Sequence, residues 1–397
     1  EGDHPIKLRM IGGPNNDSYE VLNGKKAHIY DFKSKPNTLL TKKGKQHIRD
    51  DYENNNYNYR KPKYNVNAVL PLIGVNPDDG LKLGIIAGHT SYGFERNPFT
   101  STNRIAAALY TSTGGFDVRY QGEFAHVVGK WNLAINGVLT SPNYSINFFG
   151  YGNSTPNPNV EDEDNFNLNY NRVKLGTLGG FVGLAWHGEN NGEFRVGVNY
   201  KTYELEETQG RYINLFSDFI PQEERNNFLG AEAVYSYTNS DNPAFPTLGM
   251  EAEFRTGITS NLDNSNTFGY FIPTLGFAYK ISPNGQLVLA TKSKAHLIFG
   301  DDFEFYQAAS IGGNDGLRGY RNERFTGKSS FYQTSDLRFN FKRYKTGLVP
   351  VEVGIFGGFD IGRIWVDDNL VVDPSFNRDI WNTSYGGGFF INGTDLV

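Results

Sequence analysis

The 397-residue chain has 38 Lys and Arg against 43 Asp and Glu, and this net charge of −5 argues against a nucleic-acid partner. No run of about 18 apolar residues occurs, so the sequence contains no transmembrane helix. Aromatic residues make up 15% of the chain and Cys is absent, which fits passage through an oxidising periplasm. If the protein spans a membrane, it must do so as a closed β-barrel, because only that structure pairs every backbone group in lipid without helices.

Residues 1–62 differ in composition from the rest of the chain and are rich in Asn, Asp and Lys. Their pattern predicts short strands around 6–11, 18–22 and 26–32, followed by a polar linker through Arg60. The run at 12–17 has the closely spaced oxygens of a calcium loop, but its chemistry favours an Asn/Gly turn. We expect residues 1–62 to be a periplasmic β segment and linker, the tail of an upstream soluble domain.

Residues 63–397 alternate between polar and apolar side chains. Within residues 116–124, one face carries four polar side chains: Asp117, Arg119, Gln121 and Glu123. Period two predicts strands with one polar and one apolar face. Because the polar faces carry charges in strand after strand and the apolar faces carry aromatics, the pattern favours a barrel with a wet interior over a soluble sandwich.

The alternation predicts fourteen strands, at 64–74, 81–92, 103–112, 116–127, 130–150, 169–187, 194–207, 228–239, 249–259, 267–281, 286–299, 329–344, 351–366 and 380–392. Longer polar connections on one side of the sheet alternate with mostly short turns on the other. This is typical of outer-membrane barrels, whose long loops lie outside the cell. The first strand follows residues 1–62, which places that segment in the periplasm.

A glycine- and arginine-rich insert, residues 312–338, interrupts the hairpins. Its Gly316-Leu-Arg-Gly-Tyr320 centre places Arg318 between two glycines, which suits an arginine aimed at a fixed acidic partner. Alternation places Asp336 and Asp360 on the polar faces of the next two strands. We therefore expect Arg318 to pair with Asp360, and secondarily with Asp336, and so to pin the loop inside the barrel. The alternative is that these are ordinary charges facing water, as in a porin.

Four separated motifs resemble the bacterial surface antigen superfamily of outer-membrane barrels, which includes BamA and TamA. They are Leu317-Arg-Gly-Tyr320, Asp336-Leu-Arg338, Phe356-Gly-Gly-Phe-Asp360-Ile-Gly362 and Pro246-Thr-Leu-Gly249. The resemblance implies an all-β, transmembrane antiparallel barrel of the 16-stranded type, with 14 strands in this chain and the last two beyond Val397. It also implies a lumenal latch formed by Arg318, Gly319, Tyr320, Asp336, Arg338 and Asp360.

The resemblance implies that the barrel inserts, assembles or translocates proteins or lipids. Its partners would be outer-membrane lipid and lipopolysaccharide, a client polypeptide or lipid, and accessory subunits. Pro71 in the first strand cannot donate to a β-ladder, which favours a loosely paired lateral seam there. The expected seam residues are Tyr64, Val66, Ala68, Leu70 and Pro71.

The segments Ile11–Pro14, Tyr30-Asp31 and Asn76–Gly80 resemble Bacteroidetes-type proteins in which a calcineurin-like phosphoesterase precedes such a barrel. That resemblance leaves a second function open, a membrane anchor for an upstream phosphoesterase, and a diffusion pore is a third.

We expect no cofactor, no metal site and no catalytic residues in this chain, which is therefore not itself an enzyme. Its seven histidines are scattered without ligand spacing: His4, His28, His47, His89, His126, His187 and His296. No nucleophile elbow or phosphate-binding loop occurs.

Overall fold

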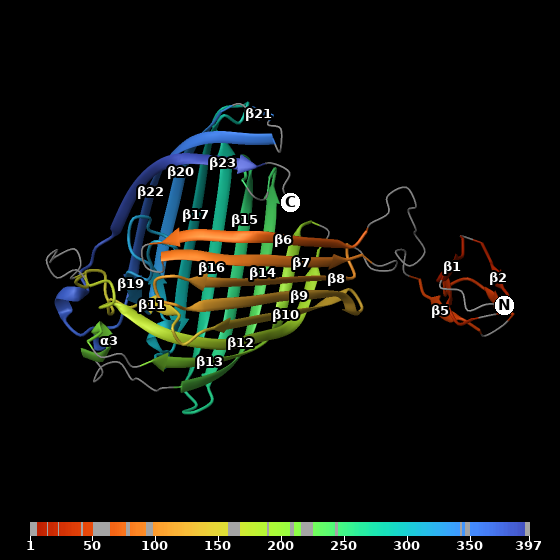
Figure 1. The fold of residues 1–397 in the computed structure, drawn as a ribbon, viewed down its shortest axis with the longest axis horizontal. Helices are drawn as coiled ribbons and strands as arrows, with labels where there is room; N and C mark the ends of the chain where they lie inside the picture. The colour runs from red at the N-terminus through yellow and green to blue at the C-terminus, as the bar shows by residue number, and fades with distance from the viewer. Residues whose placement is uncertain are drawn as a thin grey trace. The chain divides into compact units, whose positions relative to one another are not determined.

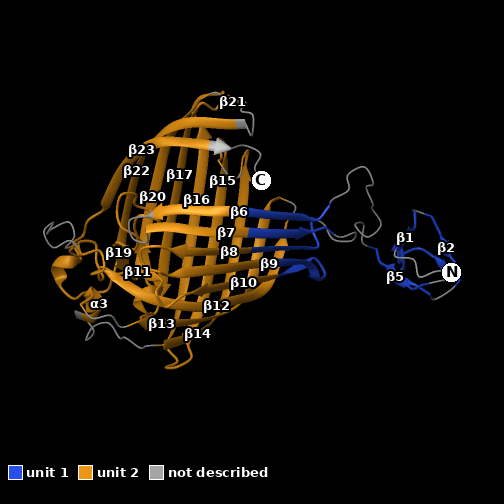
Figure 2. Cartoon of the chain, in the orientation of Figure 1, with its two compact units in different colours: residues 1–69, 87–104, 122–133 blue, residues 70–86, 105–121, 134–397 orange. Residues whose placement is uncertain are grey.

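The computed structural model describes residues 6–13, 15–22, 24–40, 43–50, 64–76, 80–92, 98–157, 167–188, 190–206, 210–215, 225–242, 245–341, 344–345 and 350–393. The expected boundary after residue 62, Pro14, the tip of the 76–80 hairpin and the last four residues lie outside these ranges. The chain divides into two compact units, coloured separately in Figure 2: residues 1–69, 87–104 and 122–133, and residues 70–86, 105–121 and 134–397. Among the described residues, no helix has the length and apolar character needed to cross a bilayer.

Five short strands open the first unit: β1 Leu8–Ile11, β2 Ser18–Tyr19, β3 Ala27–Asp31, β4 Thr38–Leu39 and β5 Lys45–Ile48. Strands β1, β3 and β5 pair in parallel, and β2 pairs in parallel with β4. Paired residues are 17 to 20 positions apart, so each coil of chain adds one strand to each of two small sheets. This is a short β-solenoid, with Tyr19, Val21, Ala27 and Ile29 buried inside it. Strands β4 and β5 lie in the stretch that was expected to be a linker, so that prediction is wrong.

Fourteen long strands follow (Figure 1): β6 Val66–Asn76, β7 Gly80–Ser91, β8 Ser101–Tyr110, β9 Phe116–Val128, β10 Trp131–Thr140, β12 Arg172–His187, β13 Gly192–Glu206, β14 Arg225–Ser240, β15 Gly249–Asn261, β16 Thr267–Lys280, β17 Leu287–Phe299, β20 Ser329–Asn340, β22 Pro350–Trp365 and β23 Asn382–Gly393. With the short strands β11 Ser145–Asn147 and β21 Tyr344–Lys345 they form one 16-stranded sheet. The order of neighbours follows the chain, and β6 stands at one end of that order.

The two faces of this sheet differ in chemistry. Large apolar side chains lie exposed on one face, among them Val198, Leu229, Ile258, Phe277 and Phe359. The opposite face carries ion pairs between neighbouring strands, such as Glu251 with Lys292 at 3.1 Å. An exposed apolar face opposite a charged one is the arrangement expected where lipid covers the outside.

The strand expected over 130–150 is shorter in the structure. It ends at Thr140, and a turn closed by the Tyr144 N–H to the Ser141 carbonyl (2.9 Å) follows. Pro142 lies in this turn and has no N–H for the ladder. After β11, the chain buries Phe148 and Phe149 at 1% and 0% exposure.

The connections at this end of the sheet share a hydrophobic core instead of being purely polar loops. They include β11, the short helix α3 Tyr212–Leu215 and the 3-10 helix η2 Phe305–Gln307. The core consists of Phe148, Tyr151, Val173, Leu175, Leu205, Tyr212, Ile213 and Phe305. Burial raises the pKa of the Tyr151 and Tyr212 hydroxyls, as expected for groups held in an apolar setting.

At the other end of the sheet, Asp241 organises the turn between β14 and β15. Its carboxylate accepts hydrogen bonds from the Thr247 hydroxyl and from the N–H groups of Thr247 and Leu248, and lies 3.2 Å from Lys280 Nζ. Burial would raise the pKa of Asp241, but these bonds outweigh it and lower the pKa.

Candidate functional site: the arginine loop

Residues 300–328 join β17 to β20 and form the arginine loop. Two short strands within it, β18 Ala309–Ile311 and β19 Phe325–Gly327, pair with each other. Leu317 is fully buried in a cluster with the side chains of Ile311, Phe325, Tyr332 and Ile364. Because Leu317 is fixed by this cluster, the direction of the next side chain, Arg318, is fixed as well.

Glycines on either side of Arg318 provide the backbone that this turn requires. Gly316 has φ +114° and Gly319 has φ +83°, a region that other residues rarely adopt. A Cβ on Gly316 would also lie 2.4 Å from the Tyr332 ring. The Gly-x-x-Gly spacing noted in the sequence is therefore needed for the loop to approach β20 closely.

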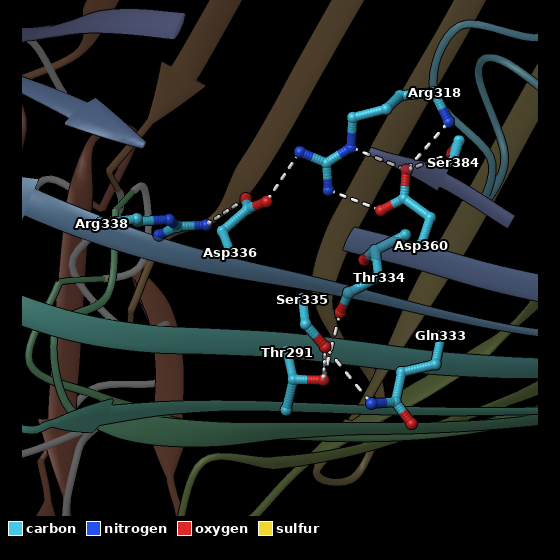
Figure 3. A network of polar contacts seen from close by, with 9 residues as sticks. All are labelled: Thr291, Arg318, Gln333, Thr334, Ser335, Asp336, Arg338, Asp360 and Ser384. Carbon is cyan, nitrogen blue, oxygen red and sulfur yellow. Dashed lines mark hydrogen bonds and ion pairs between the residues drawn. The ribbon is translucent and has the colours of Figure 1, made fainter. Parts of the chain in front are cut away.

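Arg318 and Asp360 form a bidentate pair (Figure 3). Arg318 Nε donates to Asp360 Oδ2 at 2.7 Å, and Nη2 donates to Oδ1 at 2.6 Å. The backbone N–H of Arg318 donates to the same Oδ2 at 3.0 Å. The structure thus brings together the two residues that the sequence suggested as partners, and it adds a backbone bond that orients the loop.

Asp360 is completely buried, at 0% exposure. In addition to the three N–H groups of Arg318, the Ser384 hydroxyl donates to its Oδ2 at 2.9 Å, which makes four donors among the described residues. A buried carboxylate needs such compensation, since burial without partners is costly. The hydrogen bonds to Asp360 raise the pKa of the Arg318 guanidinium.

Asp336 lies between two arginines. Its Oδ1 is 2.8 Å from Arg318 Nη1, an ion pair whose angle falls short of a hydrogen bond, and its Oδ2 is 3.7 Å from Arg338 Nη2. Arg338 in turn lies over the Phe245 ring at 4.6 Å. Asp336 is thus a weaker, secondary partner of Arg318, and it lies between Arg318 and Arg338.

A pair of glycines makes room for the Arg318 side chain. Gly358 on β22 is paired with Asp336 on one side and with Gly386 on β23 on the other. A Cβ on Gly358 would lie 2.1 Å from Arg318 Nη1, and one on Gly386 would lie 3.2 Å from Arg318 Cδ. Neither glycine nor Ser384 was among the expected site residues. The Gly386-Gly-Gly388 run, unusual inside a strand, is the signal that could have indicated them.

Two further contacts tie the loop to the sheet. Asp315 accepts hydrogen bonds from the Tyr332 hydroxyl at 2.6 Å and from Lys294 Nζ at 2.5 Å. The Tyr320 hydroxyl donates to the Thr383 carbonyl at 3.2 Å. The loop is therefore attached to β17, β20, β22 and β23.

The loop also binds the segment that follows β11. The guanidinium of Arg324 donates to the hydroxyl and the carbonyl of Thr155 at 2.6 and 2.5 Å, and Arg321 donates to Asn147 Oδ1 at 2.8 Å. Asn153, at 2% exposure, pairs both ends of its amide with the backbone of Ile364, each at 2.9 Å. The arginine loop, residues 145–155 and the end of β22 are thus joined by buried polar contacts.

The charged face of the sheet is not filled by the loop. Adjacent cavities of about 290 and 260 Å³ share the lining residues Thr238, Glu251 and Lys292. Both are polar enough to hold water.

The expected seam residues occupy the first long strand. Val66, Ala68, Leu70 and Pro71 lie in β6, and Tyr64 precedes it by two positions. Val66, Leu70 and Tyr64 are exposed. Within the part of the chain that the structure describes, no three His, Cys, Asp or Glu side chains gather as they would around a metal ion.

Comparison with solved structures gives BamA from Haemophilus ducreyi lacking POTRA domains 1–3, with a TM-score of 0.57 and 16% identity over 82% of this chain. CdiB from Escherichia coli matches with a TM-score of 0.48 and 10% identity over 84% of this chain, and CdiB from Acinetobacter baumannii with 0.41 and 10% over 83%. The chain spans 64%, 57% and 60% of these structures, respectively. No curated protein sequence matches.

At this identity the likeness to BamA shows the fold alone, and it confirms the predicted all-β antiparallel barrel. The predicted fusion to a phosphoesterase stays a prediction. The model of the Omp85 superfamily domain matches residues 131–392, more than half of the chain. The protein therefore belongs to the Omp85 superfamily of outer-membrane β-barrels.

Proposed function

We propose that this barrel inserts, assembles or translocates proteins or lipids at the outer membrane, with the arginine loop latched inside it by Arg318 and a lateral seam at β6. Family membership supports the general activity. The latch rests on the geometry of the loop, and the seam rests on the position of β6.

The observation that carries the proposal is the contact of Arg318 with buried Asp360. A bidentate pair supported by Ser384 fixes the loop against the inner face of the sheet. The connections that contain β11, α3 and η2 share a packed hydrophobic core, which a simple diffusion pore does not require. These contacts favour a barrel whose interior is blocked by the arginine loop and which acts at the lateral seam. They are less expected in a diffusion pore, whose interior must be open.

The seam at β6 rests on chain order and chemistry. β6 is the terminal strand in the order of neighbours, and Pro71 within it has no N–H to donate. An edge strand offers backbone groups to which a client strand can add. Residues 1–62 would lie in the periplasm and residues 63–397 in the membrane, in contact with outer-membrane lipid and lipopolysaccharide.

The test uses the full-length protein in liposomes with an unfolded outer-membrane barrel as client. Faster appearance of the client's folded, heat-modifiable band than in protein-free liposomes is expected. Equal rates in both would contradict the proposal and leave a membrane anchor as the better function. Steady conductance in planar bilayers without any change to the arginine loop would instead favour a diffusion pore.

A further inference from the structure

Four polar side chains lie together on the apolar face of the sheet, the face that lipid covers. They belong to the neighbouring strands β17 and β20, and we call them the polar patch: Thr291, Ser293, Gln333 and Ser335. Thr291 lies directly opposite Ser335 in the register of the two strands. Ser293 lies opposite Gln333 in the same way. The four side chains therefore form a square on one face.

Apolar side chains surround the polar patch. Along β17 and β20, the next pair on this face is Leu289 with Leu337, at 40% and 46% exposure. In the other direction the next pair is Ala295 with Phe331. On the strands to either side, β16 and β22, the residues opposite the patch are also apolar: Leu275, Phe277, Phe359 and Ile361. The patch is thus a polar island in a surface that otherwise suits acyl chains.

The polar patch lies near the middle of the membrane span. Its members are the fifth and seventh residues of the 13-residue β17 and of the 12-residue β20. Lipid has only hydrocarbon at this depth, and a polar group without a partner is costly there. Lipid therefore cannot satisfy the patch.

The patch satisfies part of its own hydrogen-bonding capacity (Figure 3). The Thr291 hydroxyl donates to the Thr334 carbonyl at 3.1 Å and lies 3.0 Å from the Ser335 hydroxyl. The Gln333 amide donates to the Ser335 hydroxyl at 3.2 Å. Among the described residues, no group donates to Gln333 Oε1, and the Ser293 hydroxyl has no hydrogen-bond partner. An acceptor and a hydroxyl are therefore open toward the membrane.

A second copy of this chain carries matching groups at the same depth. Two copies inserted in the same direction form a closed pair only around a two-fold axis along the membrane normal, and this axis brings each residue to the depth of its own copy. The patch is uncharged, so two patches do not repel each other. An amide both donates and accepts, so two Gln333 side chains can exchange two hydrogen bonds.

We propose that the barrel forms a symmetric dimer in the membrane through the polar patch, with the Gln333 amides of the two copies paired across the two-fold axis. The apolar side chains around the patch pack in the same contact and exclude lipid from it. β6 does not neighbour β17 or β20 in the strand order, and the dimer does not use the proposed seam.

The first test measures association in liposomes. Because the chain has no Cys, Asn264→Cys in the exposed turn between β15 and β16 gives a single labelling site. Donor-labelled and acceptor-labelled protein are reconstituted together, and energy transfer is followed as lipid is added. Transfer should persist at dilutions at which randomly distributed barrels show none. Transfer no greater than that of random mixing would overturn the proposal.

Two variants locate the contact. Each hydrogen bond between membrane-spanning segments strengthens association about threefold, so Gln333→Leu, which removes two, should weaken the dimer about tenfold. The control Thr256→Val removes another hydroxyl from the same face, one that already donates to the Tyr270 carbonyl at 3.0 Å, and should leave association unchanged. Both variants should keep the heat-modifiable band of a folded barrel, which separates loss of the dimer from loss of the fold. Equal effects of the two variants would contradict the assignment.

Cross-linking gives a second measurement without altering the patch. Ala295→Cys lies next to Ser293 on the same face of β17, and oxidation should link two copies through it. Ala231→Cys on β14 lies on the same face between Val198 and Ile258 and should stay monomeric. Equal linking at both positions would overturn the proposal. A link from Ala295→Cys to a different membrane protein, with none between copies, would also overturn it.

Discussion

Replacing Arg318 by Ala removes both side-chain bonds to Asp360. Among the described residues, the carboxylate at 0% exposure then keeps two neutral donors, the backbone N–H of residue 318 and the Ser384 hydroxyl. Breaking a buried pair by removing one partner costs about 3–5 kcal/mol. The remaining donors and the 28% exposure of Arg318 place the expected loss near the lower end, about 3 kcal/mol. The free energy of unfolding in detergent, from urea titration, should fall by that amount.

The control is Arg255→Ala in the same sheet. Arg255 faces Glu232 and Glu253 at 3.5 and 3.4 Å and is 39% exposed, so its loss should cost about 0–1 kcal/mol. In a double-mutant cycle, Arg318→Ala and Asp360→Ala should couple by about 2–3 kcal/mol. Trypsin should also cleave the arginine loop faster in Arg318→Ala protein. Unchanged unfolding and unchanged cleavage would refute the reasoning.

Three further predictions follow from individual contacts. Gly358→Ala should displace the Arg318 guanidinium and speed trypsin cleavage of the loop, whereas Gly357→Ala, with nothing within 4 Å of the new Cβ, should not; equal effects would contradict the steric argument. Asn153→Ala leaves two buried backbone groups without partners and should lower the free energy of unfolding by about 2–4 kcal/mol, measured by urea titration; a loss below about 0.5 kcal/mol would count against it. Because the pKa of Asp241 is lowered on folding, its contribution to stability is present above an unfolded pKa of about 3.9 and is lost as pH falls below it. Asp241→Asn should therefore lower the unfolding midpoint more at pH 7 than at pH 2, and a pH-independent difference would be the contrary result.

Local periodicity accounts for much of what the sequence predicted. Apolar and charged side chains alternate along any strand that has one face toward lipid and the other toward the barrel interior, so the strands can be read from the sequence. Each of the fourteen expected strands overlaps a strand of the structure. The approach of Arg318 to Asp360 could also be expected, because a charge on an inner wall needs a partner and only a few candidates lie on the following strands.

Other features depend on contacts between distant segments, which a periodic pattern does not contain. Residues 145–155 turn inward because Arg321 and Arg324 of a distant loop bind them. The space that Gly358 and Gly386 leave for the Arg318 side chain exists because the pairing of β22 with β23 places these two glycines side by side. The N-terminal coils pair in parallel over 17 to 20 residues, and two of their strands are only two residues long, too short for alternation to be seen.

The most direct test of the central claim is the rate of client insertion into liposomes across the double-mutant cycle of Arg318 and Asp360. If the latched loop serves insertion, both single Ala variants should slow the appearance of the folded client, and the double variant should be no slower than the worse single one. Trypsin cleavage of the same samples reports whether the loop is released. A loop that is released in every variant while insertion keeps its original rate would contradict the account.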